Sequence, residues 1–299
     1  MDDVNTTIEM EIKRQVRQFY DQIGWQEAGE GFYQNARYED LRPVSREYIH
    51  RCHLRVARHL NPDGKYLLDA GSGPIQYPEY LEYSRGYQAR VCADISKVAL
   101  REARQRIGDR QNGGHGLFVV ADVANLPFKP EIFDGVVSLH TIHHLPEGEH
   151  RQAYGELYRV LALHNAAIVV NGWVDPPLMR FFNAPLQWIN QVRRKAQRMW
   201  GKAPLPKKSI HVRTRLNGSK LKGTFISKNN AAWMKLEIGS SMPLEVLVWR
   251  SVSVKFLRTF VHQRLGGRWF LRLLFWMEER FPHFFGEKGQ YPLIVIRKS

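Results

Sequence analysis

The sequence predicts an α/β protein: a seven-strand doubly wound sheet with N-terminal helices and an insertion after the fifth strand. Between residues 65 and 175, short apolar runs alternate with helix-like segments, which is typical of parallel sheets. Several of these runs end on an acidic residue, at the edge where such sheets bind ligands. A chain of 299 residues with 43% hydrophobic residues is long enough to bury this core.

The first five strands and their helices are expected in regular order. We expect strands at 65–70, 88–93, 117–121, 133–139 and 166–170, with helices at 78–85, 96–107 and 147–161 between them. Ser96 is a typical N-cap residue and marks the start of the second of these helices.

The flanking parts predict further helices and two more strands. Apolar residues at helical spacing predict one helix near the N-terminus and an amphipathic helix at 42–60. After residue 176 we expect a helix at 178–200, a loop or ribbon at 201–222, a short helix at 229–238, a sixth strand at 244–256, a helical region at 260–285 broken at Gly266, and a last strand at 291–297.

Composition excludes several classes of protein. The apolar fraction excludes a disordered chain, and no run approaches the roughly 18 apolar residues of a membrane span. Residues 1–5 are acidic and lack an apolar core, so we expect no secretory signal peptide. Cys52 and Cys92 are too few for a disulfide framework or a metal knuckle. We therefore expect a soluble, cytoplasmic protein of a reducing compartment.

The turn after the first strand, residues 71–76 (GSGPIQ), carries two close glycines. It lacks the third glycine of a dinucleotide fingerprint, and the chain has no Gly-Lys-Ser/Thr of a P-loop. Asp69, just before the glycines, disfavours a phosphate and favours a cation. Asp94 is placed to accept hydrogen bonds from a ribose diol, and Asp122 could accept one from an adenine amine. An adenosine with a cationic, phosphate-free tail fits these residues better than NAD.

Four stretches carry a resemblance to a known family. They are residues 67–73 (LLDAGSG), 93–96 (ADIS), 121–128 (ADVANLPF) and 133–146, which contains FDGVVSLH and IHHLP. In their order and spacing they resemble the motifs of class I S-adenosylmethionine-dependent methyltransferases, most closely small-molecule enzymes related to quinone-biosynthesis methyltransferases. The chain departs from the pattern at Pro74 and Ile75, where many members carry another glycine. The resemblance implies a Rossmann-like methyltransferase fold with S-adenosyl-L-methionine as cofactor.

The resemblance also implies roles for the matched positions. Gly71 and Gly73 would let the backbone approach the methionine part, while Asp94 would hold the ribose hydroxyls. The cofactor-binding residues expected in this way are Asp69, Ala70, Gly71, Ser72, Gly73, Asp94, Ile95, Ala121, Asp122, Val123, Leu139 and His140. The alternative is that each strand-end acid only caps the helix that follows.

Methyl transfer from a sulfonium needs an acceptor atom held close to the methyl group, a water-poor pocket and, for some acceptors, a base. His140 and His143 follow the fourth strand and are the candidate bases, whereas His144 is expected to pack. Tyr20 would cover the methionine part or the acceptor, or pack as ordinary aromatic core. No metal site is expected, because no carboxylate or cysteine completes a ligand set beside the adjacent histidines.

The charge of the chain, +15 in total, is unevenly distributed. Residues 1–60 hold 9 Lys and Arg against 10 Asp and Glu, residues 61–176 hold 11 against 14, and residues 177–299 hold 24 against 5. The expected organisation is a helical cap at 1–60, a cofactor-binding α/β core at 61–176, a basic acceptor-side insertion at 177–243, and the last core strands with a helical insertion at 244–299.

The basic, Trp-rich C-terminal part allows several interpretations. It could contact an anionic membrane surface and admit a lipid-like acceptor, bind an anionic small molecule, bind RNA or DNA, or be a solvated face. Nucleic acid is less favoured, because residues 138–141 (SLHT) lack the Asn/Asp-Pro-Pro-Tyr/Phe loop typical of base amino methylation.

These observations lead to one expected function and two alternatives. The expected function is methyl transfer to a small-molecule or lipid-like acceptor at oxygen, nitrogen or carbon, in the cytoplasm or at a membrane. The alternatives are an RNA or DNA methyltransferase and a cofactor-binding protein that has lost catalysis.

Overall fold

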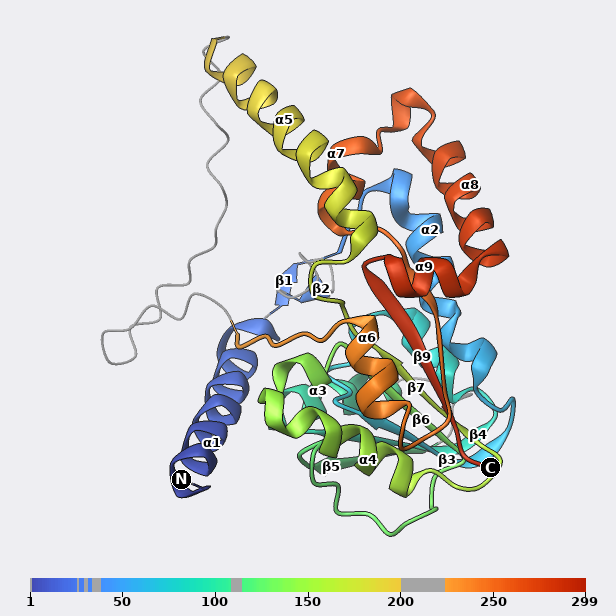
Figure 1. Ribbon diagram of the computed structural model, residues 1–299. Coiled ribbons are helices and arrows are strands. Elements are labelled where there is room, and N and C mark those ends of the chain that lie inside the picture. The colour runs from blue at the N-terminus through green and yellow to red at the C-terminus, as the bar shows by residue number, and fades with distance from the viewer. Residues whose placement is uncertain (1, 26, 30–31, 34–38, 109–114, 200–223) are drawn as a thin grey trace.

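A seven-stranded mixed sheet forms the centre of the computed structural model, which describes residues 2–25, 27–29, 32–33, 39–108, 115–199 and 224–299 (Figure 1). The strands are β3 (Gly64–Ala70), β4 (Tyr87–Asp94), β5 (His115–Val120), β6 (Gly135–Leu139), β7 (Ala166–Val170), β8 (Leu244–Arg250) and β9 (Tyr291–Arg297). Their order is β5-β4-β3-β6-β7-β9-β8. Neighbours from β5 to β7 are parallel, and β9 runs antiparallel to both β7 and β8. The predicted fold class is confirmed.

Helices surround this sheet. The α-helices are α1 (Asp2–Phe19), α2 (Pro43–Leu54), α3 (Lys97–Gly108), α4 (His150–Val160), α5 (Pro177–Met199), α6 (Ala231–Trp233), α7 (Val254–Phe260), α8 (Gly267–Arg280) and α9 (Pro282–Lys288). Shorter helical turns are η1 (Tyr20–Gly24), η3 (Val56–His59), η4 (Pro78–Ser84), η5 (Ile142–His144), η6 (Glu147–Glu149), η7 (Met234–Ile238) and η8 (Gln263–Leu265). None of the helices in the described parts of the chain is long and apolar enough to cross a membrane.

Both faces of the sheet are covered, as a doubly wound fold requires. Leu68 of β3 packs in a cluster with α4, while its neighbour Leu67 packs in a separate cluster with α3 and η4. Successive residues of a strand point to opposite faces, so one apolar run serves both clusters. This explains why the predicted strands read as continuous apolar runs.

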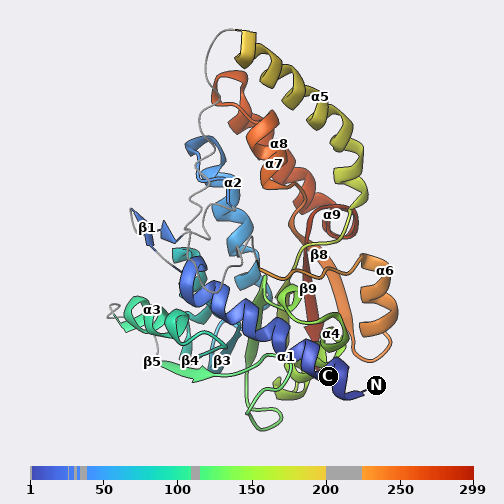
Figure 2. The ribbon, with the colours of Figure 1, turned by 90° about the vertical axis from the view of Figure 1, so that its left-hand side faces the viewer.

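Four helices form a further layer above the carboxyl edge of the parallel strands, which we call the helical end (Figures 1 and 2). They are α2, α5, α7 and α8, and they share one apolar cluster that includes Tyr48, Met179, Phe256 and Leu274. Helix α1 lies apart from this cluster, against the sheet-bearing part of the molecule (Figure 2). The helical end therefore unites one helix from the N-terminal part with three from the C-terminal half.

A buried ion pair joins the helical end to the sheet. Arg55, which follows α2 and is 3% exposed, donates from Nη1 to Glu278 Oε2 at 2.9 Å and to the carbonyl of Trp249 at 2.8 Å. Glu278 of α8 is fully buried and also accepts hydrogen bonds from the Tyr48 hydroxyl at 2.7 Å and the Ser251 backbone N–H at 2.9 Å. One carboxylate thus connects α2, α8 and the end of β8.

A second buried pair lies next to it. Arg250, the last residue of β8, donates from Nη1 to Glu39, which precedes α2. Burial alone would raise the pKa of Glu39, but the charge of Arg250 and the nearby imidazole of His53, 3.8 Å away, lower it to about 2. Glu39 therefore stays ionised, and the pair remains charged at neutral pH.

Local details confirm some predictions and correct others. Ser96 Oγ accepts a hydrogen bond from the Ala99 N–H at 3.0 Å, and Gly266 has a φ of 70° at the predicted break. The predicted sixth strand, 244–256, was too long: Ser253 Oγ accepts from the Phe256 N–H at 3.1 Å and starts α7. Such an N-cap begins a new helix, so the strand ends at Arg250.

Two other segments differ from the sequence prediction, and a third is not tested. The segment predicted as a helix at 78–85 is the 3₁₀-helix η4. Two short strands, β1 (Glu27–Gly29) and β2 (Phe32–Tyr33), form an antiparallel pair that was not predicted. The loop or ribbon predicted at 201–222 lies outside the described residues.

Replacing Glu278 with alanine should lower the free energy of unfolding by about 3–5 kcal/mol. The change removes the buried carboxylate partner of Arg55, leaves Glu279 at 2.9 Å from Arg55 Nε, and takes the acceptor from the Tyr48 hydroxyl and the Ser251 N–H. Urea denaturation followed by circular dichroism measures this loss. The control is Glu47→Ala, which removes an exposed ion pair with Arg272 at 3.0 Å and should leave the free energy nearly unchanged. Equal losses from both variants would contradict a central role for the buried pair.

Candidate functional site

A cavity of about 390 Å³ lies at the carboxyl edge of the parallel strands. Its walls come from the exits of β3, β4 and β6, from α1 and η1, and from residues 224–228. The volume falls in the range of small-molecule binding sites. The cavity is therefore the candidate site.

Nine of the twelve expected cofactor-binding residues line this cavity. They are Gly71, Ser72, Gly73, Asp94, Ile95, Asp122, Val123, Leu139 and His140. Asp69, Ala70 and Ala121 are buried and are not among its lining residues. The Asp69 carboxylate instead forms a buried ion pair with Arg90 of β4, whose Nε lies 3.2 Å from Oδ2. Asp69 is therefore the counter-ion of Arg90 inside the sheet.

The glycine turn is shaped by two close approaches of the chain. Gly71 and Gly73 have φ angles of 76° and 54°, in the left-handed region that favours glycine. A Cβ atom on Gly71 would lie 2.2 Å from the Thr141 side chain, and one on Gly73 would lie 3.2 Å from the Trp25 ring. Only glycine at position 71 lets the exits of β3 and β6 meet at this distance.

Asp94 is held in place by backbone groups. Its Oδ2 accepts from the Gly73 N–H at 2.9 Å, and its Oδ1 accepts from the Ser96 N–H at 2.8 Å. Each carboxylate oxygen can accept a second hydrogen bond. Burial raises the pKa of Asp94 to about 6, although the two backbone hydrogen bonds oppose this shift. The arrangement suits a pair of hydroxyl donors in the cavity.

Asp122 already has a cationic partner from α1. Lys13 Nζ lies 2.5 Å from Asp122 Oδ2 and 2.6 Å from Glu149 Oε1, while Asp122 Oδ1 accepts from the Ala124 N–H at 2.9 Å. An amine that binds Asp122 would share it with Lys13 or displace it. Lys13 was not predicted from the sequence, because helical periodicity marks only the apolar face of α1.

The histidine loop has defined tautomers. His144 Nδ1 donates to the carbonyl of Phe225 at 2.8 Å, so its Nε2 accepts from the Tyr20 hydroxyl at 2.8 Å. His143 Nδ1 pairs with the amide oxygen of Asn171 at 3.2 Å, which leaves its Nε2 as an acceptor. Tyr20 and His144 both line the cavity, and the roles expected for them stay predictions.

His140 adopts an unusual backbone conformation, with a φ of 57°. Its ring lies 5.0 Å from that of Trp249 and 5.7 Å from that of Tyr291. Burial and the nearby charge of Arg250 lower the pKa of His140 to about 3, and burial with two neighbouring histidines holds the pKa of His143 well below 6.5. Both imidazoles are therefore neutral at pH 7.

Several lining residues near these histidines were not found from the sequence. They are Glu39, Tyr77, Tyr80, Gly172, Lys228, Arg250 and Tyr291. They come from segments far apart in the chain, and no local motif marks them. The one sequence feature that indicated Lys228 was the stretch from residue 176 to residue 236, which contains no acidic residue.

Among the described residues, no group of three or more His, Cys, Asp or Glu side chains could hold a metal ion.

The comparisons with known sequences identify the central domain. Residues 68–167 match the family described as a methyltransferase domain. A curated relative, the tRNA (carboxymethyluridine(34)-5-O)-methyltransferase of Arabidopsis thaliana, is 26% identical over 136 residues. That match covers 40% of this chain and 31% of the relative, so the chain spans about a third of the relative's length.

Solved structures with the same fold cover nearly the whole chain. The geranyl diphosphate C-methyltransferase from Streptomyces coelicolor A3(2) matches with a TM-score of 0.53 and 12% identity, over 96% of this chain and 98% of its own. The phosphoethanolamine N-methyltransferase 2 of Haemonchus contortus matches with a TM-score of 0.51 and 14% identity, over 95% of this chain and 60% of its own. Likeness at these identities shows the fold alone.

The matched region contains three of the four stretches in full and all but the first residue of the stretch at 67–73. The relation to quinone-biosynthesis enzymes stays a prediction. Residues 68–167 of this chain therefore form a methyltransferase domain, and the chain as a whole has the fold of the methyltransferase structures named above.

Proposed function

We propose that this chain transfers a methyl group from S-adenosylmethionine to a small, lipid-like acceptor at an anionic membrane surface. The observation that carries the proposal is the contact between the cavity and the helical end. Glu39 lines the cavity, and its carbonyl accepts a hydrogen bond from Arg258 Nη2 of α7 at 2.8 Å. The helical end, in turn, has an outer surface that is both aromatic and basic.

The cofactor end of the cavity fits S-adenosylmethionine. Asp94 keeps lone pairs for the ribose diol, and the turn at Gly71 and Gly73 lets the backbone approach the methionine part. The acidic Asp94 and Asp122 suit a cationic sulfonium better than a phosphate. When bound here, S-adenosylmethionine supplies the electrophilic methyl group.

The histidines serve the acceptor. His143 has an available Nε2, because Asn171 holds the proton on Nδ1, and His140 lies beside it with a ring separation of 6.2 Å. A neutral imidazole can take a proton from an acceptor hydroxyl as the new bond to carbon forms, or from the ammonium that an amine acceptor becomes once it is methylated. The proton of Tyr20 is donated to His144, so we assign Tyr20 to closing the cavity rather than to proton transfer.

The helical end exposes an unusual number of large apolar side chains. On α8, Trp269, Leu273 and Trp276 follow at spacings of four and three residues and are 74%, 54% and 60% exposed. On α5, Phe181 and Trp188 are 75% and 66% exposed. Exposed aromatic stripes of this kind are typical of helices that lie in a membrane interface.

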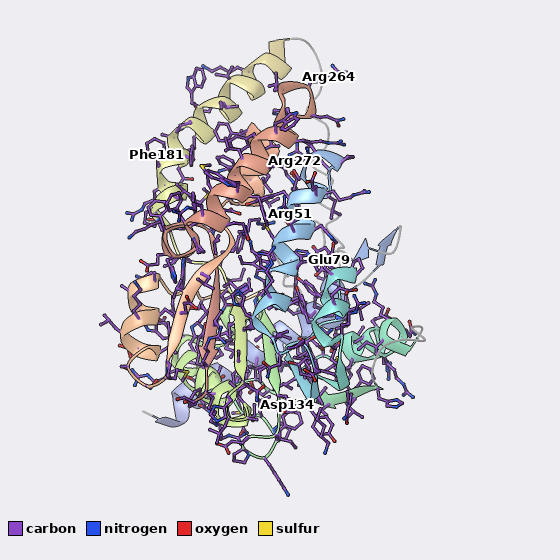
Figure 3. The ribbon with its side chains drawn as sticks, turned by 90° about the vertical axis from the view of Figure 1, so that its right-hand side faces the viewer. Arg51, Glu79, Asp134, Phe181, Arg264 and Arg272 are labelled. Carbon is purple, nitrogen blue, oxygen red and sulfur yellow. The ribbon has the colours of Figure 1, made fainter. Side chains whose placement is uncertain are left out.

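Basic residues accompany these aromatic side chains. Figure 3 shows Phe181, Arg264 and Arg272 at the helical end, at the surface of the molecule. Arg268 and Arg280 are further exposed bases on α8. Each base close to an anionic membrane contributes about 1 kcal/mol of attraction. The combination of apolar and basic side chains therefore favours an anionic bilayer as the partner.

RNA methylation is the second candidate. It is supported by the Arabidopsis thaliana relative, which is named for a tRNA uridine, and by the 24 Lys and Arg against 5 Asp and Glu in residues 177–299. Retention of labelled tRNA on filters at moderate salt tests it. Tight retention of tRNA together with absent vesicle binding would favour RNA as the acceptor.

The affinity for S-adenosylmethionine should depend on Asp94 and on pH. As the pH falls through about 6, protonation of Asp94 removes a hydrogen-bond acceptor, so the Kd should rise, whereas it should be constant above pH 7. Asp94→Asn should bind about 10-fold more weakly and lose most of this pH dependence. Isothermal titration calorimetry from pH 5 to pH 8 measures both effects.

The control for that experiment is Asp63→Asn, because Asp63 is an exposed carboxylate outside the cavity lining. It should keep the wild-type affinity and the wild-type pH profile. An unchanged Kd in Asp94→Asn, or a wild-type Kd that does not rise at pH 5, would contradict the role given to Asp94.

Membrane binding should depend on the aromatic stripe of α8. The double variant W269S/W276S should pellet at least about 10-fold less with vesicles that contain phosphatidylserine, because two large apolar side chains no longer enter the interface. Wild-type protein should pellet weakly with neutral phosphatidylcholine vesicles. The control Leu236→Ser removes a side chain that is 71% exposed elsewhere and should have no effect. Equal recovery with both vesicle types would refute the membrane proposal.

A further inference from the structure

We propose that the acceptor carries an anionic group, a carboxylate or a phosphate, and that Lys228 and Arg250 bind this group beside His140. The inference rests on the proposed methyl transfer, because it assigns the acceptor side of the same cavity. It names the chemistry of the acceptor, which the methyltransferase domain itself does not indicate.

Lys228 is a half-buried cation that lines the cavity. Among the described residues, no carboxylate lies within ion-pair distance of its Nζ, and its own stretch from residue 176 to residue 236 contains no acid. Burial lowers the pKa of Lys228, and no neighbouring acid opposes this shift. Even a half-buried charge without a partner is costly to a fold, so a ligand that completes the pair is the simpler explanation.

The neighbours of Lys228 hold it in position. The Ser227 N–H donates to the carbonyl of His143 at 2.8 Å, and the carbonyl of Asn229 accepts from the Val174 N–H at 3.0 Å. Gly172 makes room for the side chain, since a Cβ there would lie 3.1 Å from Lys228 Nζ. The lysine is therefore anchored on both sides and presented next to the histidine loop.

Arg250 adds a second donor. It is 2% exposed, lines the cavity and packs its guanidinium over the ring of Tyr291, with 4.7 Å from Cζ to the ring centre. Its Nη1 is engaged by Glu39, but its buried Nε–H has no acceptor among the described residues. A buried donor left open in this way is what an anionic oxygen would satisfy.

The charges around His140 point to the same ligand. Lys228 and Arg250 carry two positive charges against the single negative charge of Glu39, and both cations help to lower the pKa of His140. A bound anion would offset them and make His140 a stronger base when the acceptor is present. The opposite end of the cavity carries Asp94 and Asp122, so the two ends suit a cationic cofactor and an anionic acceptor.

Binding of simple amphiphiles tests the inference. The probes are decyl phosphate, decanoate, decanol and decyltrimethylammonium below their micelle concentrations, titrated calorimetrically into protein saturated with S-adenosylhomocysteine. The two anions should bind at least about 10-fold more tightly than the alcohol or the cation. Inorganic phosphate distinguishes the source of the anion: affinity equal to that of decyl phosphate supports a free anion, and much weaker affinity supports an amphiphile with an anionic head.

Lys228→Met should weaken binding of both anionic probes by about 10-fold or more and leave decanol and S-adenosylhomocysteine binding unchanged. Its Tm should equal or exceed that of the wild type, because the variant removes an unpaired, half-buried charge, whereas a purely structural lysine would give a lower Tm. The control Lys235→Met removes an exposed lysine that pairs with Glu287 at 2.5 Å, and it should bind every probe like the wild type.

Three results would overturn the inference. They are equal affinity for charged and uncharged probes, unchanged anion binding in Lys228→Met, and a loss in that variant of S-adenosylhomocysteine binding alone, which would assign Lys228 to the cofactor carboxylate. The anion titrations are also carried out without S-adenosylhomocysteine, so that the two proposals can fail separately. A protein that does not bind S-adenosylhomocysteine contradicts the proposed methyl transfer alone. A protein that binds the anionic probes no more tightly than decanol contradicts the acceptor subsite alone.

Discussion

The pairing of buried charges at the end of β8 is the constraint on which the rest of the structure depends. Arg55 and Arg250 are 3% and 2% exposed, and each has a buried carboxylate partner from a distant part of the chain, Glu278 and Glu39. Replacing such pairs by apolar residues would cost little, but breaking one leaves a bare charge in the interior. The helices can therefore dock on the sheet in few ways, and this docking closes one wall of the cavity.

The same docking separates the cavity into parts of different charge. The exits of β3 and β4 contribute Asp94 and the glycine turn, because parallel strands place their carboxyl ends at one edge. The antiparallel end contributes Arg250 and Tyr291, and the segment before α6 contributes Lys228. The acidic part agrees with a sulfonium cofactor, and the basic part supports an anionic acceptor. The neutral His140 and His143 line the same cavity.

Much of the fold and part of the site could be predicted from residues close together in the chain. The strand that precedes Gly71, the N-cap at Ser96 and the break at Gly266 are local features, and the structure has all three. The predicted sixth strand was too long because residues 251–254 (SVSV) continue a strand-like alternation of polar and apolar residues, and only the Ser253 cap shows where the helix begins. Asp69 has the right motif position, but its carboxylate is engaged by Arg90, whose position on the neighbouring strand no motif records.

By itself the sequence determined the order of the elements, the methyltransferase domain and the carboxylates at the strand ends. Each of these depends on spacings of a few residues, which periodicity and capping preferences control. Only the tertiary structure decided that Lys13 reaches Asp122, that Tyr20 reaches His144, and that Lys228 lies beside the histidine loop. Lys13 and Asp122 are 109 positions apart, and only the packing of the whole chain brings such side chains together.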